Sequence, residues 1–295
     1  MQPTIPPTSP VHVIGAAGRS GRAVCRALSL LGTPVVPIVR NPAAATGLTG
    51  LRVADLTGPA DTLRTALADA TRIVCTAHAR NVPALLAAAP PTARLVCLGS
   101  TRKFTRWPDA HGNGVLLGER ALLASGRSGV MLHPTMIYGA QGENNVQRLA
   151  ALLRHLPVIP LPGGGRALVQ PIWQGDVTAS ILAALKKEWD GPHSMVIAGQ
   201  NAVPYRQFAS MVAQAAGLGP RPTITLPTGL LMLLARVAAR VPGLPHIGAD
   251  EIRRLLENKN FDIGPMQATL GVTPIGLAEG LHHTFFEAGL TPARA

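Results

Sequence analysis

The chain has 295 residues, a length that fits one large domain or two smaller ones around a substantial core. Apolar residues make up 47% of it and aromatic residues only 3%, so Ala, Leu and Val must fill that core. The net charge of +12 favours anionic partners such as a phosphorylated cofactor or acidic lipid headgroups, while the scarcity of aromatic side chains for base stacking disfavours nucleic acid.

The N-terminal residues 1–10 are proline-rich and lack the basic and apolar segments of a signal peptide, so we expect a loose leader there. No apolar run is long enough to cross a bilayer. We therefore expect a cytoplasmic protein, with attachment to the inner face of a membrane as an open alternative. The three cysteines lie in apolar patterns without metal-ligand spacing, which predicts buried thiols and no metal site.

Residues 11–28, V-H-V-I-G-A-A-G-R-S-G-R-A-V-C-R-A-L, organise the first half of the chain. A buried strand is predicted over Val11–Ile14, and a helix is predicted after three glycines spaced G-x-x-G-x-x-G. This order is typical of the phosphate-binding corner of a dinucleotide-binding fold, because the free N–H groups at the helix start face the anion. An ordinary glycine-rich turn is the alternative. The cofactor contacts expected there are Gly15, Ala17, Gly18, Arg19, Ser20 and Gly21.

Short apolar runs then alternate with helical patterns, which predicts a parallel, doubly wound sheet with helices on both faces. The predicted strands are 35–39, 52–56, 72–76, 94–98 and 130–132, and the helices between them are 61–70, 83–89 and 118–125. Ligands of such sheets bind beyond the carboxyl ends of the strands. Those ends carry Arg40, Asp55, Leu56, Thr76, Ala77, His78, Ser100 and His133.

The pattern changes near residue 160 from regular alternation to an irregular, helix-rich half. The fold class is therefore α/β, a Rossmann-type doubly wound parallel sheet with a smaller, helix-rich C-terminal lobe. We expect a dinucleotide-binding domain over 11–160 and a substrate or partner lobe over 161–295, some of whose strands are free to rejoin the first domain. The helices predicted in this half are 175–185, 205–216, 228–241, 249–257 and 277–288.

Taken together, these pieces resemble the extended short-chain dehydrogenase/reductase superfamily. The likeness is strongest to the atypical branch of nucleoside-diphosphate-sugar epimerase-like proteins, which includes the nucleotide-binding accessory subunit of respiratory complex I. It spans residues 11–285. The segments that carry it are the glycine motif, Asp55-Leu56, Gly99-Ser100, H-P-T-M-I-Y-G at 133–139, L-P-G-G-G-R at 161–166 and Q-P-I-W-Q-G-D-V at 170–177.

The resemblance implies roles for individual residues. Asp55 would bind the adenine amino group with Leu56 nearby, Ser100 would take the position of the catalytic serine, and His133 would stand where relatives often carry an arginine near the nicotinamide. Each has a plainer alternative as a turn, capping or structural residue. The cofactor is NADP, because Arg40 follows the second strand where an NAD-selective protein places a carboxylate; NAD stays possible, since Arg40 also reads as a surface arginine.

One departure from the superfamily is pronounced. Its catalytic signature is Tyr-x-x-x-Lys, and neither Tyr138 nor Tyr205 is followed by a lysine four residues later. The register places His111 and Val115 at the two positions. His111 is a candidate substitute acid or base because imidazole titrates near neutrality, but its loop-like surroundings, D-A-H-G-N-G, also fit a plain surface histidine.

Two classes of function stay open. The first is an oxidoreductase or epimerase-like enzyme acting on a nucleotide-linked or other small substrate, with Ser100 and His111 as candidate catalytic residues. The second is a non-catalytic NADPH-binding structural, assembly or redox-sensing protein. The apolar helix at 228–241, with Arg236 and Arg240, suggests contact with a membrane or a protein partner, or a cover over the protein's own substrate pocket.

Overall fold

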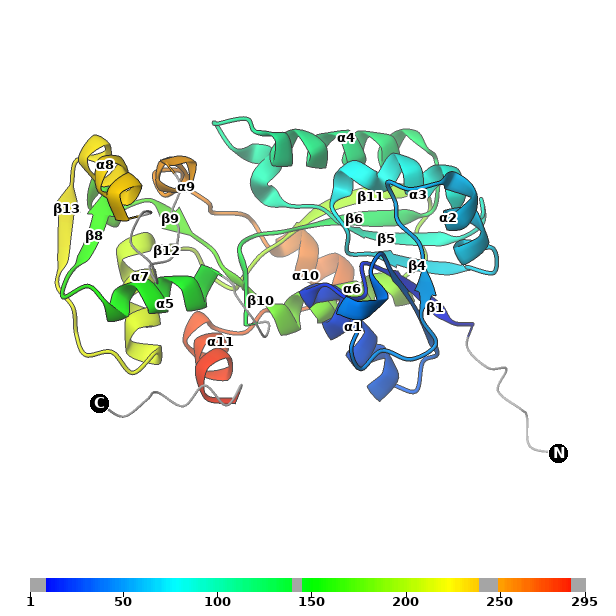
Figure 1. Ribbon diagram of the computed structural model, residues 1–295, viewed down its shortest axis with the longest axis horizontal. Coiled ribbons are helices and arrows are strands. Elements are labelled where there is room, and N and C mark those ends of the chain that lie inside the picture. The colour runs from blue at the N-terminus through cyan, green and yellow to red at the C-terminus, as the bar shows by residue number, and fades with distance from the viewer. Residues whose placement is uncertain (1–8, 140–144, 239–248, 288–295) are drawn as a thin grey trace.

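The apolar runs of the first two hundred residues form the strands of one parallel sheet. The computed structural model describes residues 9–139, 145–238 and 249–287. Seven strands lie side by side in the order β11-β6-β5-β4-β1-β2-β3 (Figure 1). Their bounds are β1 Val11–Ile14, β2 Val35–Val39, β3 Arg52–Val53, β4 Arg72–Cys75, β5 Arg94–Leu98, β6 Gly129–Pro134 and β11 Pro192–Ile197. This arrangement confirms the predicted Rossmann-type doubly wound fold.

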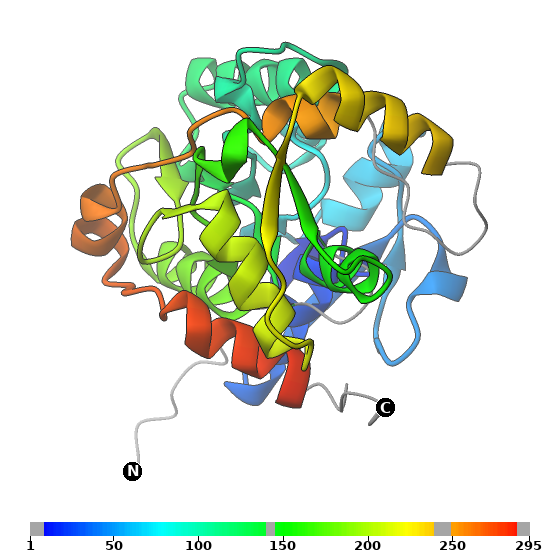
Figure 2. The ribbon, with the colours of Figure 1, turned by 90° about the vertical axis from the view of Figure 1, so that its left-hand side faces the viewer.

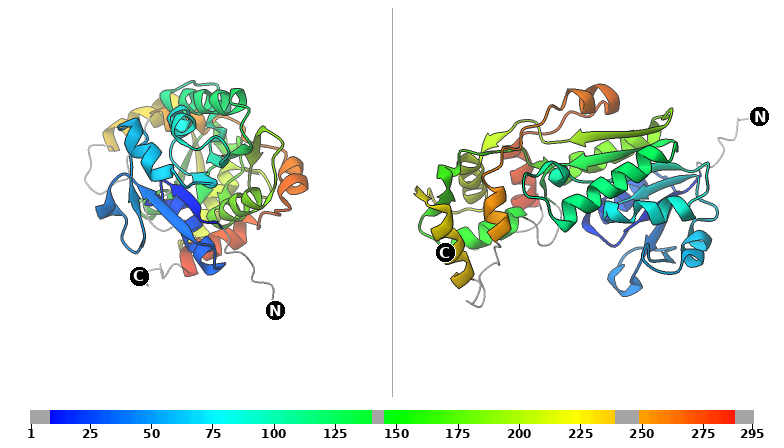
Figure 3. Two further views of the ribbon diagram at one scale, coloured as in Figure 1. Left: turned by 90° about the vertical axis from the view of Figure 1, so that its right-hand side faces the viewer. Right: turned by 90° about the horizontal axis from the view of Figure 1, so that it is seen from above.

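Helices cover both faces of the sheet because side chains that alternate along each strand are apolar in both directions. On β1, Val13 packs with one layer of helices and Ile14 with the other. The first layer consists of α1 (Arg19–Leu30), α6 (Gln174–Lys186) and α10 (Gly264–Leu270), and the second of α2 (Ala60–Leu67), α3 (Val82–Ala88) and α4 (Ala110–Ala124) (Figures 1 and 3). All three cysteines are buried in these layers as free thiols, as predicted.

The strand order reverses between β1 and β4. Strands β1, β2 and β3 extend to one side of this point, and β4, β5, β6 and β11 to the other. Connections that leave neighbouring strands in opposite directions open a crevice at their carboxyl ends, where ligands of doubly wound sheets bind. The polar residues predicted at the ends of β2, β4 and β5 follow these strands at this edge, whereas His133 lies within β6 and is buried.

The second half of the chain contributes to two regions. Strand β11 pairs with β6, and α6 and α10 pack on the sheet, so these elements join the sheet domain although they follow residue 160. The remainder forms a smaller lobe with its own apolar clusters (Figures 1 and 2). Its helices are α5 (Asn145–Arg154), α7 (Tyr205–Ala215), α8 (Thr228–Ala238), α9 (Ala249–Arg254) and α11 (Leu277–His282).

Three pairs of short strands in the described part of the chain connect segments that are distant in sequence. Strands β8 (Ile159–Pro162) and β13 (Thr223–Leu226) run parallel, and Figure 2 shows them side by side at the end of the lobe that faces the viewer. The other pairs are β7 (Ile137–Tyr138) with β10 (Ile172–Trp173), and β9 (Leu168–Val169) with β12 (Val203–Pro204). Within the described residues, no helix is both long and apolar enough to span a membrane.

The helix α4 departs from the sequence prediction. A helix was expected from Gly118, with a loop over D-A-H-G-N-G, but the helix begins at Ala110, and the Asp109 side chain caps it by accepting from the Gly112 N–H at 2.8 Å. The glycines that weaken the helical pattern are needed for close packing. A Cβ atom at Gly118 would lie only 1.9 Å from the carbonyl oxygen of Ala79. Tertiary contact therefore overrides the low helix propensity of glycine here.

Candidate functional site

The three glycines after β1 form a turn that leaves no room for side chains. Gly15 has a φ of +79°, and a Cβ atom there would lie 2.8 Å from Oγ1 of Thr76. A Cβ atom at Gly21 would lie 2.2 Å from the Gly15 carbonyl oxygen, so α1 packs directly against the turn. The first bond of α1 runs from the Arg22 N–H to the Gly18 carbonyl at 2.8 Å, which leaves the N–H groups of the first helical turn without intrahelical acceptors.

Side chains around this turn hold it in place. The Arg22 guanidinium donates to the carbonyls of Ala17 at 3.1 Å and Thr46 at 2.8 Å, so it ties the turn to the segment after β2. The Ser20 hydroxyl donates to Oε1 of Gln174 on α6 at 3.0 Å, whereas Arg19 is exposed. Of the two arginines, Arg19 is thus the one available to an approaching anion.

Arg40 and Asp55 stand at the ends of β2 and β3, on one side of the switch point. Arg40 is exposed, and Leu56 is buried beside Asp55. Hydrogen bonds from the Thr57 backbone N–H and hydroxyl, both 2.9 Å, hold the pKa of the Asp55 carboxyl below its ordinary value, and Arg40 lowers it further. A guanidinium and an ionised carboxylate therefore face the same end of the crevice.

A pair of histidines lies on the other side of the switch point. His78 Nδ1 accepts from the Arg80 backbone N–H at 3.1 Å, so its proton is on Nε2, which lies 3.1 Å from Nδ1 of His111. Burial lowers the pKa of His78 to about 4, with His111 and Arg80 adding to the shift. Burial and then Arg102 lower the pKa of His111 as well, so both rings are neutral at pH 7.

His111 occupies the first turn of α4 and is half-buried, as part of a pair rather than as a free surface side chain. Val115 lies one turn further along, 1% exposed in the core cluster below the sheet edge. At the two positions predicted for the missing Tyr-x-x-x-Lys pair, the structure therefore has the half-buried ring of His111 and the core side chain of Val115.

His133 lies beneath the site, not on its surface. Its side chain has no exposed area, and its Nδ1 accepts from the Ser100 N–H at 3.2 Å. Its Nε2 lies 3.1 Å from Oε1 of Glu119 and 3.0 Å from the Ser194 hydroxyl, and Lys103 pairs with the same carboxylate. This buried, hydrogen-bonded ring supports the end of β5, and the expected contact between His133 and a cofactor stays a prediction.

Thr76 and Ser100 mark the middle and the far end of the edge. The Thr76 hydroxyl lies 3.0 Å from the Ile14 carbonyl, which links β4 to β1, and Ala77 follows half-buried. The Ser100 hydroxyl accepts from the Arg102 N–H at 3.1 Å and caps the short helix Thr101–Phe104. Ser100 also lines a cavity of about 380 Å³ that residues of the sheet domain and of the lobe surround.

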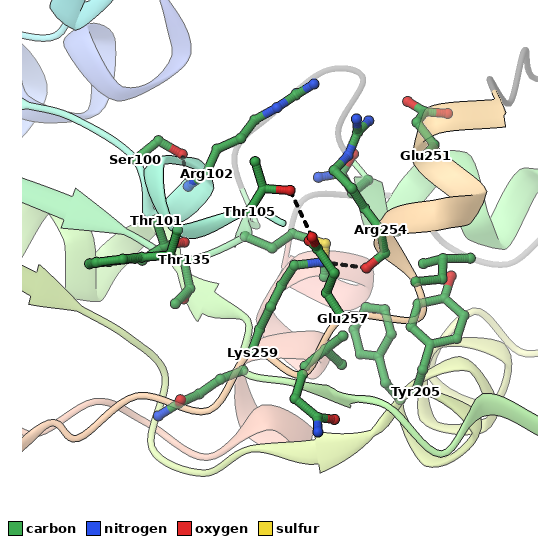
Figure 4. A pocket seen from close by; sticks show the side chains of 18 of the residues that line it. Ser100, Thr101, Arg102, Thr105, Thr135, Tyr205, Glu251, Arg254, Glu257 and Lys259 are labelled. Carbon is green, nitrogen blue, oxygen red and sulfur yellow. Dashed lines mark hydrogen bonds between the residues drawn. The ribbon is translucent and has the colours of Figure 1, made fainter. Parts of the chain in front are cut away.

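The cavity is lined by both regions of the chain (Figure 4). Ser100, Thr101 and Arg102 border one side of it, and Tyr205 and Glu251 border the other, with Lys259 and Glu257 between them. Sequence reasoning missed the residues from the lobe, because they follow no motif. The one local signal is the polar run E-N-K-N at 257–260, directly after α9.

The fold is shared with solved structures of dinucleotide-binding enzymes. The structure of MoeE5 in complex with UDP-glucose and NAD matches with a TM-score of 0.69 and 20% identity over 95% of this chain and 99% of that one. The NADPH-dependent quinone oxidoreductase QOR2 of Escherichia coli, complexed with NADPH, matches with a TM-score of 0.70 and 21% identity over 93% and 99%.

The UDP-glucose 4-epimerase of Thermotoga maritima, solved with UDP-glucose, matches with a TM-score of 0.71 and 14% identity over 96% and 100%. No protein-family model matches the chain, and no curated protein matches it in sequence. The likeness therefore lies in the fold, and the activity must be argued from the site.

Proposed function

We propose that this protein binds a nicotinamide dinucleotide, NADPH in preference to NADH, along the carboxyl edge of its sheet. The observation that carries the proposal is the glycine turn, where an added Cβ atom at Gly15 would collide with Thr76 at the end of β4 and one at Gly21 would collide with the turn itself. Such a turn at a helix N-terminus lets a pyrophosphate approach backbone N–H groups closely. The bound dinucleotides of MoeE5 and QOR2, on the same fold, support this assignment.

The residues along the edge fit such a cofactor. The first turn of α1, which begins at the exposed Arg19, would hold the pyrophosphate. Arg40 and Asp55 would bind the adenosine half, Arg40 through a 2′-phosphate. Thr76, Ala77 and His78 would border the middle of the cofactor. When bound, the nicotinamide supplies hydride transfer.

The activity that we propose is reduction or epimerisation of a small substrate held in the cavity that Ser100 lines. Ser100 would orient a substrate oxygen, and neutral His111 would act as a hydrogen-bond donor through its Nε2–H, because its Nδ1 accepts from Nε2–H of His78. A positioned acid or base contributes about 10²–10⁴-fold to a rate. Holding the cofactor and the substrate in reacting geometry accelerates the reaction further. Because no lysine stands at position 115, we expect slow turnover.

The second candidate is a non-catalytic NADPH-binding protein. The burial of Val115 favours it, because this side chain cannot perform the work of the lysine ammonium. Single-turnover oxidation of bound NADPH, with carbonyl and sugar-nucleotide substrates, separates the candidates. We expect slow oxidation that falls in Ser100→Ala and His111→Ala. Fast oxidation that both substitutions leave untouched would show that the catalytic site lies elsewhere, and no oxidation would favour the non-catalytic protein.

Cofactor binding itself is tested by Gly18→Ala. Residue 18 has an ordinary φ of −74°, and its Cβ atom would lie 3.2 Å from the Gly15 carbonyl, so the turn must shift slightly to admit a methyl group that would then obstruct the pyrophosphate; thermal unfolding of the variant checks that it stays folded. We expect NADPH affinity to fall at least about tenfold, about 1.4 kcal/mol. Gly219→Ala is the matched control, because open space surrounds that position. Equal NADPH affinity of the two variants would refute the proposed site.

A further inference from the structure

Lys259 is the one lysine among the residues that line the cavity. It follows α9, and its backbone N–H donates to the Leu168 carbonyl at 2.8 Å, which fixes the segment against β9. Its ammonium donates to the Arg254 carbonyl at 2.8 Å, as the dashed line in Figure 4 marks. A neutral carbonyl thus takes one of its three N–H donors.

No carboxylate of the described residues forms an ion pair with the Lys259 ammonium. The nearby carboxylates have other partners: Glu257 accepts from the Thr105 hydroxyl at 2.8 Å and the Arg106 N–H at 2.7 Å. Oδ2 of Asp109 accepts from Nε of Arg102 at 2.7 Å and lies 3.7 Å from Nη1 of Arg254. Among the residues that line the cavity, the five cations outnumber the two carboxylates, Glu251 and Glu257.

The Lys259 side chain is partly buried, and a partly buried ammonium is costly unless a counter-charge compensates it. Burial lowers the pKa of Lys259, the neighbouring Arg254 and Arg102 lower it further, and Glu257 opposes them only in part. An anion inside the cavity would supply the missing charge and take the free N–H donors. The other cavity walls carry apolar rings, those of Phe104, Phe208 and Phe261.

We propose that Lys259 and Arg254 bind the anionic group, a carboxylate or phosphate monoester, of a compact substrate whose apolar body packs on these phenylalanine rings. The substrate role rests on the proposed function, whereas the anion site itself does not require the cofactor. The volume of about 380 Å³ lies near the lower end of the range for ligand pockets, about 300–1,000 Å³, which suits a small acid.

The chain has only four lysines, Lys103, Lys186, Lys187 and Lys259, so NMR of the full protein with ¹³Cε-labelled lysine resolves each ammonium separately. The probes are benzoate, phenyl phosphate and the neutral benzamide. We expect the Lys259 signal to shift saturably with at least one acid and its pKa to rise, while benzamide has no effect and the exposed Lys186 and Lys187 do not respond. The tighter acid identifies the anionic group. No saturable shift with either acid would overturn the proposal.

Substitutions test the same site. Lys259→Met should weaken binding of the preferred acid about tenfold to a hundredfold, and Lys259→Arg should restore most of the affinity. Lys186→Met, on the exposed end of α6, is the matched control. Unchanged affinity in a folded Lys259→Met would refute the anion site. NADPH titration of the unmodified protein keeps the two proposals apart. If the unmodified protein binds NADPH but neither acid, only the anion site is refuted; if it binds an acid but not NADPH, only the cofactor proposal is refuted.

Discussion

Arg40 decides the predicted choice between the two nicotinamide cofactors. It is exposed at the end of β2, and the described residues place no other arginine at that strand end. A charge-assisted hydrogen bond to phosphate contributes about 1.5–3 kcal/mol, so Arg40→Asp should lower NADPH affinity about tenfold to a hundredfold and leave NADH affinity unchanged or higher. Calorimetric titration measures both. Arg26→Asp, exposed on α1, is the control; equal affinities for NADPH and NADH in the unmodified protein would contradict the prediction.

Single residues also show where sequence reasoning reached its limit. The glycine turn could be predicted because its backbone requirement is local: Gly15 needs a positive φ, and Gly21 faces an atom six residues away. The burial of His133 could not be predicted, because its partners Glu119 and Ser194 lie on α4 and β11, which only the folded sheet brings together.

At the scale of the element, helix α4 depends on the absence of side chains along one face. Replacing an exposed helical glycine by alanine usually stabilises a helix by about 1 kcal/mol. At Gly118 the added Cβ would meet the Ala79 carbonyl, so we expect Gly118→Ala to lower the free energy of unfolding by about 1–3 kcal/mol. Denaturant unfolding measures this, with Gly219→Ala as the control. A stabilised Gly118→Ala would mean that the contact between α4 and the segment after β4 is looser than described.

Helix α8 presents leucines to solvent rather than to the cavity. Leu230, Leu233 and Leu234 are 44%, 57% and 48% exposed, and no described residue of α8 lines the cavity. The sequence also predicts Arg236 and Arg240 on this surface. The side chain of Arg236 and the whole of Arg240 lie outside the described part of the chain. We predict that this surface adds membrane affinity, so the protein should sediment with anionic liposomes at low salt and Leu233→Ser should reduce the bound fraction. Absence of binding at low salt would leave a protein partner as the remaining explanation of these leucines.

At the scale of the whole molecule, a buried carboxyl couples stability to pH. Asp176 on α6 is 6% exposed and accepts from the Ile275 N–H at 3.2 Å, and burial raises its pKa to about 6 from 3.8. Its stabilising contribution is therefore complete below pH 3.8 and lost as the pH rises through 6. Asp176→Asn should raise the free energy of unfolding by about 1–3 kcal/mol at pH 8 and change it little at pH 4. The same difference at both pH values would contradict this account.

The cavity explains why the fold was more predictable than the site. Strand–helix alternation predicts the parallel sheet from patterns that span five to fifteen residues. The cavity walls come from segments about residues 100, 135, 147, 170, 205 and 255, and no short pattern reports that such segments will meet. Lys259 gains its significance from the residues around it, and therefore could not be singled out by sequence alone.

The position of β11 at the edge of the sheet has a consequence for biosynthesis. Its partner β6 ends at Pro134, whereas β11 begins only at Pro192, so a growing chain holds β6 as an open edge while the intervening residues are made. Open edges and uncovered apolar faces invite aggregation. We predict that a nascent chain stopped before Pro192 depends on a chaperone, and that it precipitates when released without one while the full chain stays in solution; a soluble, monomeric truncated chain would show that β6 needs no such protection.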